Sequence, residues 1–213
     1  EFFNRGYNAY VIQYPCAPNR FPAQLTVAAA AMDTIRKRAS LCKTDPKKVF
    51  AVGFSAGGHL AASLGAFWNR EMVYGALGLK PEDVKPNGQI LCYPVITSGE
   101  LAHRGSVEKL LGAECGNAEK LELISLEKQV TADVPATFLW HTRTDQAVPV
   151  ENSLAYAEAM QKNGVDFEMH IYPVGGHGLS LATEETGGGD EGMIQPYCTG
   201  WVDMVKAWMR YHF

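Results

Sequence analysis

Residues 49–62, VFAVGFSAGGHLAA, constrain the fold of this chain more than any other stretch. Their first half is apolar, which is typical of a buried strand, and their second half has the small residues of a closely packed helix. Between the two halves, GFSAG fits the G-x-S-x-G pattern, in which a serine occupies a strained turn from strand to helix. Glycines two positions before and after Ser55 leave space for such a turn. The segment therefore predicts an α/β unit that exposes Ser55 at the carboxyl end of its strand.

Strand-like and helix-like patterns alternate along the 213 residues. Apolar and β-branched runs predict five strands, at residues 7–14, 48–54, 89–96, 136–141 and 166–172. The longer helices are predicted at 21–40, 56–68 and 150–163, with an amphipathic C-terminal helix that buries Trp201, Met204, Val205 and Trp208. This alternation predicts an α/β fold with a doubly wound, mostly parallel sheet and helices on both of its faces.

The remaining segments add to this sheet without dividing it. Residues 97–134 lack a strand pattern, and we expect them to form a small helical excursion above the sheet. Residues 183–192 are acidic and rich in glycine, which is typical of a flexible surface loop. Because no internal repeat or long linker interrupts the pattern, we expect residues 1–213 to form a single domain.

The composition, with 46% apolar residues, 20% charged residues and a net charge of −4, is that of an ordinary globular protein. Neither sign of charge dominates, so we expect no nucleic-acid partner and no membrane partner. No apolar run reaches the about 18 residues of a membrane-spanning helix. The five cysteines are widely spaced without a C-x-x-C pair, which favours free, mostly buried thiols over disulfides. We expect neither a metal nor a cofactor.

A serine hydroxyl is a weak nucleophile, so chemistry at Ser55 requires a general base and an acidic partner for that base. In an open parallel sheet such groups gather on the loops that follow the strands. His177 lies just beyond the last predicted strand among flexible glycines, which makes it the candidate base. The five other histidines fit this position less well, and His141, although at a strand end, precedes the candidate acid. They are His59, His103, His141, His170 and His212.

Asp145 follows the preceding predicted strand and is the candidate acid. An aspartate at this place also suits an Asx turn or a helix cap, which is the structural alternative. Asp133 and Asp190 are weaker candidates, because the first precedes its strand and the second lies in the glycine-rich loop. The chain order of Ser55, Asp145 and His177 is the order expected for a nucleophile, acid and base in this architecture.

Residues 45–61 resemble the corresponding segment of the α/β-hydrolase superfamily, and more narrowly that of small carbohydrate-esterase and acetylxylan-esterase-like members. Residues 2–14 are similar to a family segment that ends in a Tyr-Pro or similar pair. The resemblance implies a serine esterase that acts through an acyl-enzyme and removes small, acetyl-like groups from carbohydrate or similar esters. The resemblance implies that Ser55 attacks the carbonyl carbon of the ester and that the backbone N–H of Ala56 stabilises the oxyanion.

The chain departs from this family in one respect. The family supplies a second oxyanion donor from a glycine-rich loop near the N-terminus, and no such loop precedes residue 49. We therefore expect N-terminal strands to be missing and the chain as given to be weakly active or inactive. We expect a cytoplasmic location. Secretion stays open, because a signal peptide would be missing together with the N-terminal strands.

Two alternative functions stay open at the level of the sequence. A serine peptidase of the prolyl-oligopeptidase kind resembles the segment around Ser55, although such enzymes usually carry a large extra domain. A catalytically silent binding protein of the α/β-hydrolase type is the second alternative, which the absent oxyanion loop favours and the intact set of Ser55, Asp145 and His177 disfavours.

Overall fold

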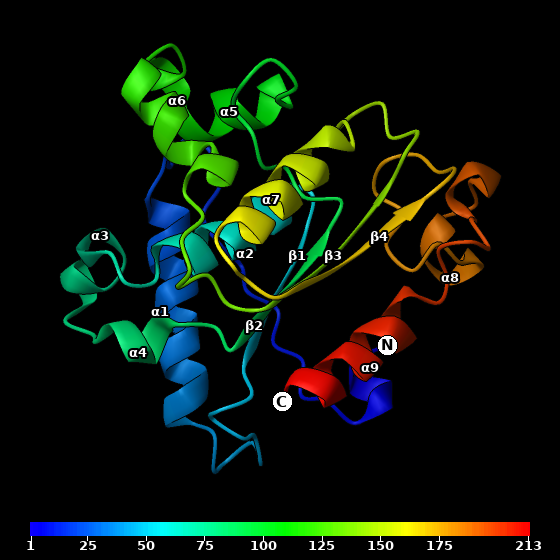
Figure 1. The fold of residues 1–213 in the computed structure, drawn as a ribbon. Helices are drawn as coiled ribbons and strands as arrows, with labels where there is room; N and C mark the ends of the chain where they lie inside the picture. The colour runs from blue at the N-terminus through cyan, green and yellow to red at the C-terminus, as the bar shows by residue number, and fades with distance from the viewer.

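A sheet of four parallel strands forms the centre of the computed structural model, which describes residues 1–213 (Figure 1). The strands lie side by side in the order in which they follow one another along the chain. Their register is continuous, so that Val52 lies opposite Ile90. The strands are β1 Phe50–Phe54, β2 Gly88–Cys92, β3 Thr137–Thr142 and β4 Phe167–Tyr172. The predicted parallel α/β sheet is therefore confirmed for four of its five expected strands.

Helices cover both faces of this sheet, as the alternation predicted (Figure 1). One face packs against α1 Ala23–Lys37, α2 Ala56–Phe67 and α7 Glu151–Lys162, and the larger of the hydrophobic cores lies between them. The other face packs against α9 Trp201–His212 through a smaller, aromatic core. In α9, three of the four predicted core positions are buried, but Met204 is 37% exposed.

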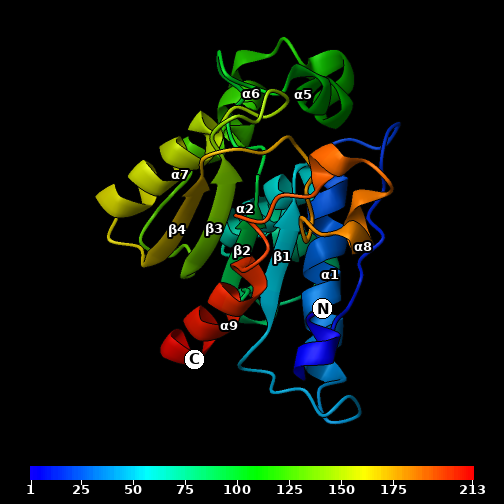
Figure 2. The same ribbon diagram turned by 90° about the vertical axis from the view of Figure 1, so that its right-hand side faces the viewer.

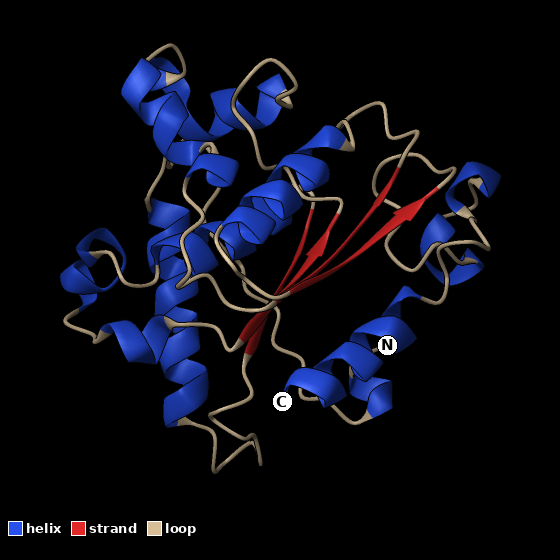
Figure 3. Ribbon diagram, viewed as in Figure 1, coloured by secondary structure: helices blue, strands red, loops and turns tan.

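Residues 97–134 form a helical excursion that contains no strand, as predicted (Figure 3). Figure 2 shows it beyond the ends toward which the strand arrows point, which are their carboxyl ends. Its helical segments are α5 Arg104–Leu111, η3 Gly112–Glu114, α6 Ala118–Ile124 and η4 Leu126–Lys128. The excursion thus stands over the edge of the sheet at which loop residues gather.

The other helical segments are single turns. They are η1 Phe3–Arg5, α3 Glu71–Tyr74, η2 Gly75–Leu77, α4 Pro81–Val84, α8 Glu184–Gly187 and η5 Glu191–Met193. Residues 183–192 were predicted as a loop, and α8 and η5 correct that prediction. No helix combines the length and the hydrophobicity that crossing a membrane requires. All five cysteines are free, but contrary to prediction only Cys92 and Cys198 are buried.

The predicted strand at residues 7–14 is wrong, because this segment has no regular secondary structure. A strand exists only through backbone pairing with a neighbour, and β1 pairs on one side alone, with β2. Side-chain contacts hold the segment instead: the amide of Asn8 donates to the carbonyl oxygen of Cys42 and to Thr44. Val11 is 93% exposed, so the apolar pattern here does not mark a buried element.

Candidate active site

Ser55 lies on a strained turn between β1 and α2. Its backbone has φ 54° and ψ −120°, a left-handed conformation that non-glycine residues rarely adopt. The peptide groups of Ser55 are held in place, since its N–H donates to the carbonyl oxygen of Cys92 and its C=O accepts from Val95. A Cβ atom at Gly53 would overlap the backbone of Gly57. The sharp turn that the glycine spacing predicted is therefore present.

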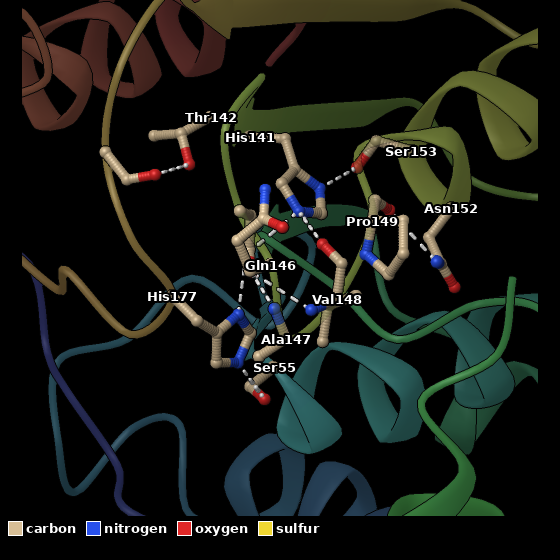
Figure 4. A network of polar contacts seen from close by, with 12 residues as sticks. Ser55, His141, Thr142, Gln146, Ala147, Val148, Pro149, Asn152, Ser153 and His177 are labelled. Atoms are coloured by element: carbon tan, nitrogen blue, oxygen red, sulfur yellow. Dashed lines mark hydrogen bonds and ion pairs between the residues drawn. The ribbon is translucent and has the colours of Figure 1, made fainter.

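The structure brings the candidate residues Ser55, His177 and Asp145 together, and Figure 4 shows the first two side by side. The Ser55 hydroxyl lies 2.7 Å from Nε2 of His177, and Nδ1 of the same ring lies 2.7 Å from Oδ2 of Asp145. With a neutral His177, the serine O–H donates to Nε2 and the Nδ1–H donates to the carboxylate. The side chain of His177 is 22% exposed and that of Asp145 is fully buried. This arrangement can activate a serine nucleophile.

The loop that carries His177 is tied to the loop that carries Asp145. The hydroxyls of Thr142 and Thr144 both donate to the carbonyl oxygen of Gly175, and the N–H of Gly175 donates back to Thr144. The ring of Tyr93 packs edge-on against His177, with 5.1 Å between ring centroids. These contacts restrict both the backbone and the ring of His177.

Asp145 accepts hydrogen bonds on both of its carboxylate oxygens. Oδ1 accepts from the backbone N–H groups of Ala147 at 2.9 Å and Val148 at 3.0 Å, which is an Asx-type turn. The structural alternative considered from the sequence is thus also realised, by the oxygen that His177 does not use. Burial alone would raise the pKa of Asp145, but hydrogen bonds from His141, His177 and Val148 outweigh it and hold that pKa well below its usual range.

His141 contacts the same carboxylate, which the sequence reasoning missed. Its Nε2 lies 3.3 Å from Oδ2 of Asp145 and 2.9 Å from the carbonyl oxygen of Val148, and its Nδ1 lies 2.8 Å from the hydroxyl of Ser153. His141 and Ser153 are fully buried. The one available signal was a histidine at a strand end four residues before the candidate acid.

The weaker sequence candidates have other contacts. His59 is buried in α2, where its Nε2 lies 3.0 Å from the carbonyl oxygen of Ile124 in the excursion. Asp133 accepts from the amide of Asn69, and Asp190 caps η5. No group of three His, Cys, Asp or Glu side chains is arranged so that it could hold a metal ion.

A cavity of about 380 Å³ adjoins the start of α2 and is lined mostly by apolar side chains. Ala56, the residue after Ser55, lines it, and as the first residue of α2 it has an N–H without an intrahelical partner. The excursion contributes Val107 and Leu110 to one wall, and the segment before α1 contributes Tyr14 to another. Burial raises the pKa of Tyr14, so its hydroxyl stays protonated at neutral pH. The cavity therefore offers a mostly apolar site beside Ala56, the residue that follows Ser55, with a few polar groups.

Comparisons with known proteins agree with this fold. The BD-FAE family model matches residues 1–160. Endo-1,4-beta-xylanase B of Butyrivibrio fibrisolvens is 39% identical over 193 residues, which are 87% of this chain. Acetylxylan esterase of Xylanibacter ruminicola is 32% identical over 153 residues, or 70% of the chain. The chain spans 29% of the length of each of these two relatives.

The fold also resembles a solved structure along nearly its whole length. The acetyl ester-xyloside bifunctional hydrolase from Caldicellulosiruptor lactoaceticus is 35% identical to this chain and superposes with a TM-score of 0.84. The similarity covers 99% of this chain and 73% of that protein. The sheet, the helices on both faces and the excursion are therefore an arrangement that a related hydrolase shares.

Proposed function

The chain belongs to the BD-FAE family and has the fold of the α/β-hydrolases, and we propose that it is a serine esterase that cleaves carboxylic esters of carbohydrates. The observation that carries this proposal is the continuous hydrogen-bonded chain from Ser55 through His177 to Asp145. The names of the acetylxylan esterase and of the acetyl ester-xyloside hydrolase support an acetyl-like acyl group on a sugar.

In the first step the Oγ atom of Ser55 attacks the carbonyl carbon of the ester. The proton of the serine hydroxyl passes to Nε2 of His177, and the charge of Asp145 stabilises the resulting imidazolium. The negative charge that develops on the carbonyl oxygen faces the start of α2, where the N–H of Ala56 and the positive end of the helix dipole stabilise it.

In the second step the tetrahedral intermediate collapses and the bond to the alcohol breaks. His177 returns its Nε2 proton to the leaving oxygen, so that the sugar leaves as a neutral alcohol and the acyl group stays on Ser55. Water then attacks the acyl-enzyme, with His177 as base, and the carboxylic acid is released. Ser55 is thereby restored with its proton.

The cavity beside Ala56 supports an ester substrate of this kind. Its volume of about 380 Å³ lies in the range of small-molecule sites and exceeds what an acetyl group alone would fill. We propose that it holds the acyl group together with part of the alcohol. Its mostly apolar lining suits the less polar faces of a sugar ring, and Tyr14 offers one hydrogen bond.

Hydrolysis of p-nitrophenyl acetate and of acetylated xylo-oligosaccharides tests this function. We expect slow release of acetate by the chain, because the N–H of Ala56 is the one oxyanion donor identified. We expect loss of that activity in Ser55→Ala, whereas Ser40→Ala, which removes an exposed serine hydroxyl, retains it. A peptide p-nitroanilide tests the peptidase alternative. Esterase activity that survives in Ser55→Ala, or cleavage of the anilide without cleavage of the esters, would contradict the proposal.

A further inference from the structure

Asp145 lies at the centre of five hydrogen-bonded side chains, of which the proposed mechanism uses three. On one side are His177 and Ser55, and on the other are His141 and Ser153 (Figure 4). The second pair comes from other elements, since His141 lies in β3 and Ser153 in the first turn of α7. One carboxylate is therefore flanked by two Ser–His pairs.

The contacts of His141 determine where its proton lies. The carbonyl oxygen of Val148, 2.9 Å from Nε2, can only accept, so Nε2 carries the proton. The same N–H also points at Oδ2 of Asp145, at 3.3 Å. Nδ1 then accepts the hydroxyl proton of Ser153 at 2.8 Å. A neutral ring satisfies all of these contacts, and it avoids placing a positive charge in a fully buried position.

These contacts complete the restraint of the Asp145 carboxylate. The backbone N–H groups of Ala147 and Val148 hold Oδ1. Oδ2 accepts the Nδ1–H of His177 from the solvent side and the Nε2–H of His141 from the interior. With the interior donor present, a rotation of the carboxylate away from His177 would break a hydrogen bond in a site that water does not reach.

We propose that His141, oriented by Ser153, is a positioning residue for the reaction, which fixes the Asp145 carboxylate in the orientation that His177 requires. This inference rests on the proposed function, because it assigns His141 a role through the Ser55–His177–Asp145 chain. His141 touches neither Ser55 nor the cavity lining, so its effect is on turnover and not on substrate binding.

Substitutions at His141 and Ser153 test this role in the full chain. His141→Phe removes both ring nitrogens at similar size, and we expect kcat to fall about 10- to 100-fold with little change in KM. His141→Gln keeps an N–H donor and should recover most of that loss, while Ser153→Ala should cost about three- to tenfold. The matched control is His170→Phe, because His170 lies on β4 and contacts the surface residue Glu168.

Double substitutions separate a positioning role from a general effect on the fold. If Ser153 acts through His141, Ser153→Ala should cause no further loss of kcat in a chain that already carries His141→Phe. Likewise, His141→Phe should cost nothing more in kcat when Asp145 is already Asn. Thermal unfolding of each variant shows whether it is folded, and Ser153→Ala and His141→Gln carry the test if His141→Phe does not fold.

Two further measurements report on Asp145 itself. Loss of the His141 donor leaves more negative charge on Oδ2 for the hydrogen bond from His177, which favours the imidazolium, so the acid limb of kcat/KM should move to higher pH in His141→Phe. The groups that face Asp145 in this site are His141, His177 and the ring of Tyr93, whose pKa burial raises. In proton NMR, the downfield resonance of the His177 N–H bonded to Asp145 should shift, which needs no turnover.

The outcomes distinguish this inference from the function on which it rests. Wild-type kcat together with an unchanged NMR resonance in folded His141→Phe would overturn the positioning role and leave the esterase proposal intact. Full additivity of His141→Phe with the Asp145→Asn substitution would overturn it as well. Activity that survives Ser55→Ala would instead remove the proposed mechanism, whatever His141 does.

Discussion

The two Ser–His pairs beside Asp145 contain the same groups in the same order but lie in different surroundings. In each pair a serine hydroxyl lies 2.7 or 2.8 Å from one ring nitrogen, and the other nitrogen faces Oδ2 of the carboxylate. His177 is 22% exposed, and Ser55 is partly exposed and precedes Ala56, which lines the cavity. His141 and Ser153 are fully buried. The two pairs therefore have the same chemical groups and differ in whether solvent and a substrate can reach them.

This difference shows why one pair suits catalysis and the other suits support. Ser55 lies at the N-terminus of α2, where free N–H groups can stabilise an oxyanion. Ser153 lies inside α7 without space for a substrate carbonyl. A buried Ser–His pair cannot reach a substrate, so the contribution that we propose for it is to hold the carboxylate of Asp145 in place.

Removal of each serine hydroxyl in turn tests the difference between the two pairs most directly. Ser55→Ala should lower kcat by about 10⁴- to 10⁶-fold because it removes the nucleophile. Ser153→Ala removes the same atom from the buried pair and should cost less than about tenfold. Turnover of p-nitrophenyl acetate measures both. Similar losses in the two variants would show that the distinction between the pairs is wrong.

Asp145→Asn removes the charge that both pairs share. We expect kcat to fall about 10⁴-fold, because the amide leaves His177 without its charged partner. The single amide oxygen also cannot accept from both the histidines and the backbone N–H groups of Ala147 and Val148. We also expect a loss of about 1–3 kcal/mol in the free energy of unfolding, since buried donors lose their acceptor. Steady-state kinetics measures the loss in kcat, and urea unfolding measures the loss in stability. The control is Asp133→Asn, because Asp133 contacts Asn69 and not the site.

Gly53→Ala affects the exposed pair alone. The added Cβ would overlap the backbone at Gly57 and displace Ser55 from His177, so kcat should fall about 10²-fold. The strain should also lower the unfolding free energy by about 1–3 kcal/mol. Gly116→Ala is the matched control, because no atom lies within 4 Å of a Cβ there. Equal effects at the two glycines would argue against a crowded turn.

The smallest expected effect concerns stability at low pH. The pKa of Asp145 is lower in the folded chain than in the unfolded chain, so its contribution to stability is fully present above about pH 4 and is lost as pH falls further. Without the His141 donor that lowering is smaller, and the stability of His141→Phe should depend less steeply on pH in this range. Urea unfolding between pH 2 and about 6 measures the difference. A steeper dependence in the variant would contradict the proposed contact.

Local patterns predicted much of the fold and the three central residues of the site. The G-x-S-x-G spacing located the turn at Ser55. A Cβ at Gly53 would overlap the backbone of Gly57, whereas a Cβ at Gly57 would meet only the hydroxyl of Tyr14, at 3.8 Å. Asp145 and His177 followed from the rule that parallel strands place their exit loops at one edge. The same patterns failed at residues 7–14, because alternation of apolar residues shows an extended chain but not whether a partner strand lies beside it.

The sequence by itself predicted the alternation of strands and helices, the strained serine turn and the candidate acid and base, because each depends on spacing within one segment or on a general rule of parallel sheets. Only the tertiary structure decided that His141 and Ser153 join the same carboxylate. Ser153 is 12 residues from His141, on a helix whose side chains reach the strand end only after α7 packs on the sheet. Such contacts depend on the packing of separate elements, which no local pattern encodes.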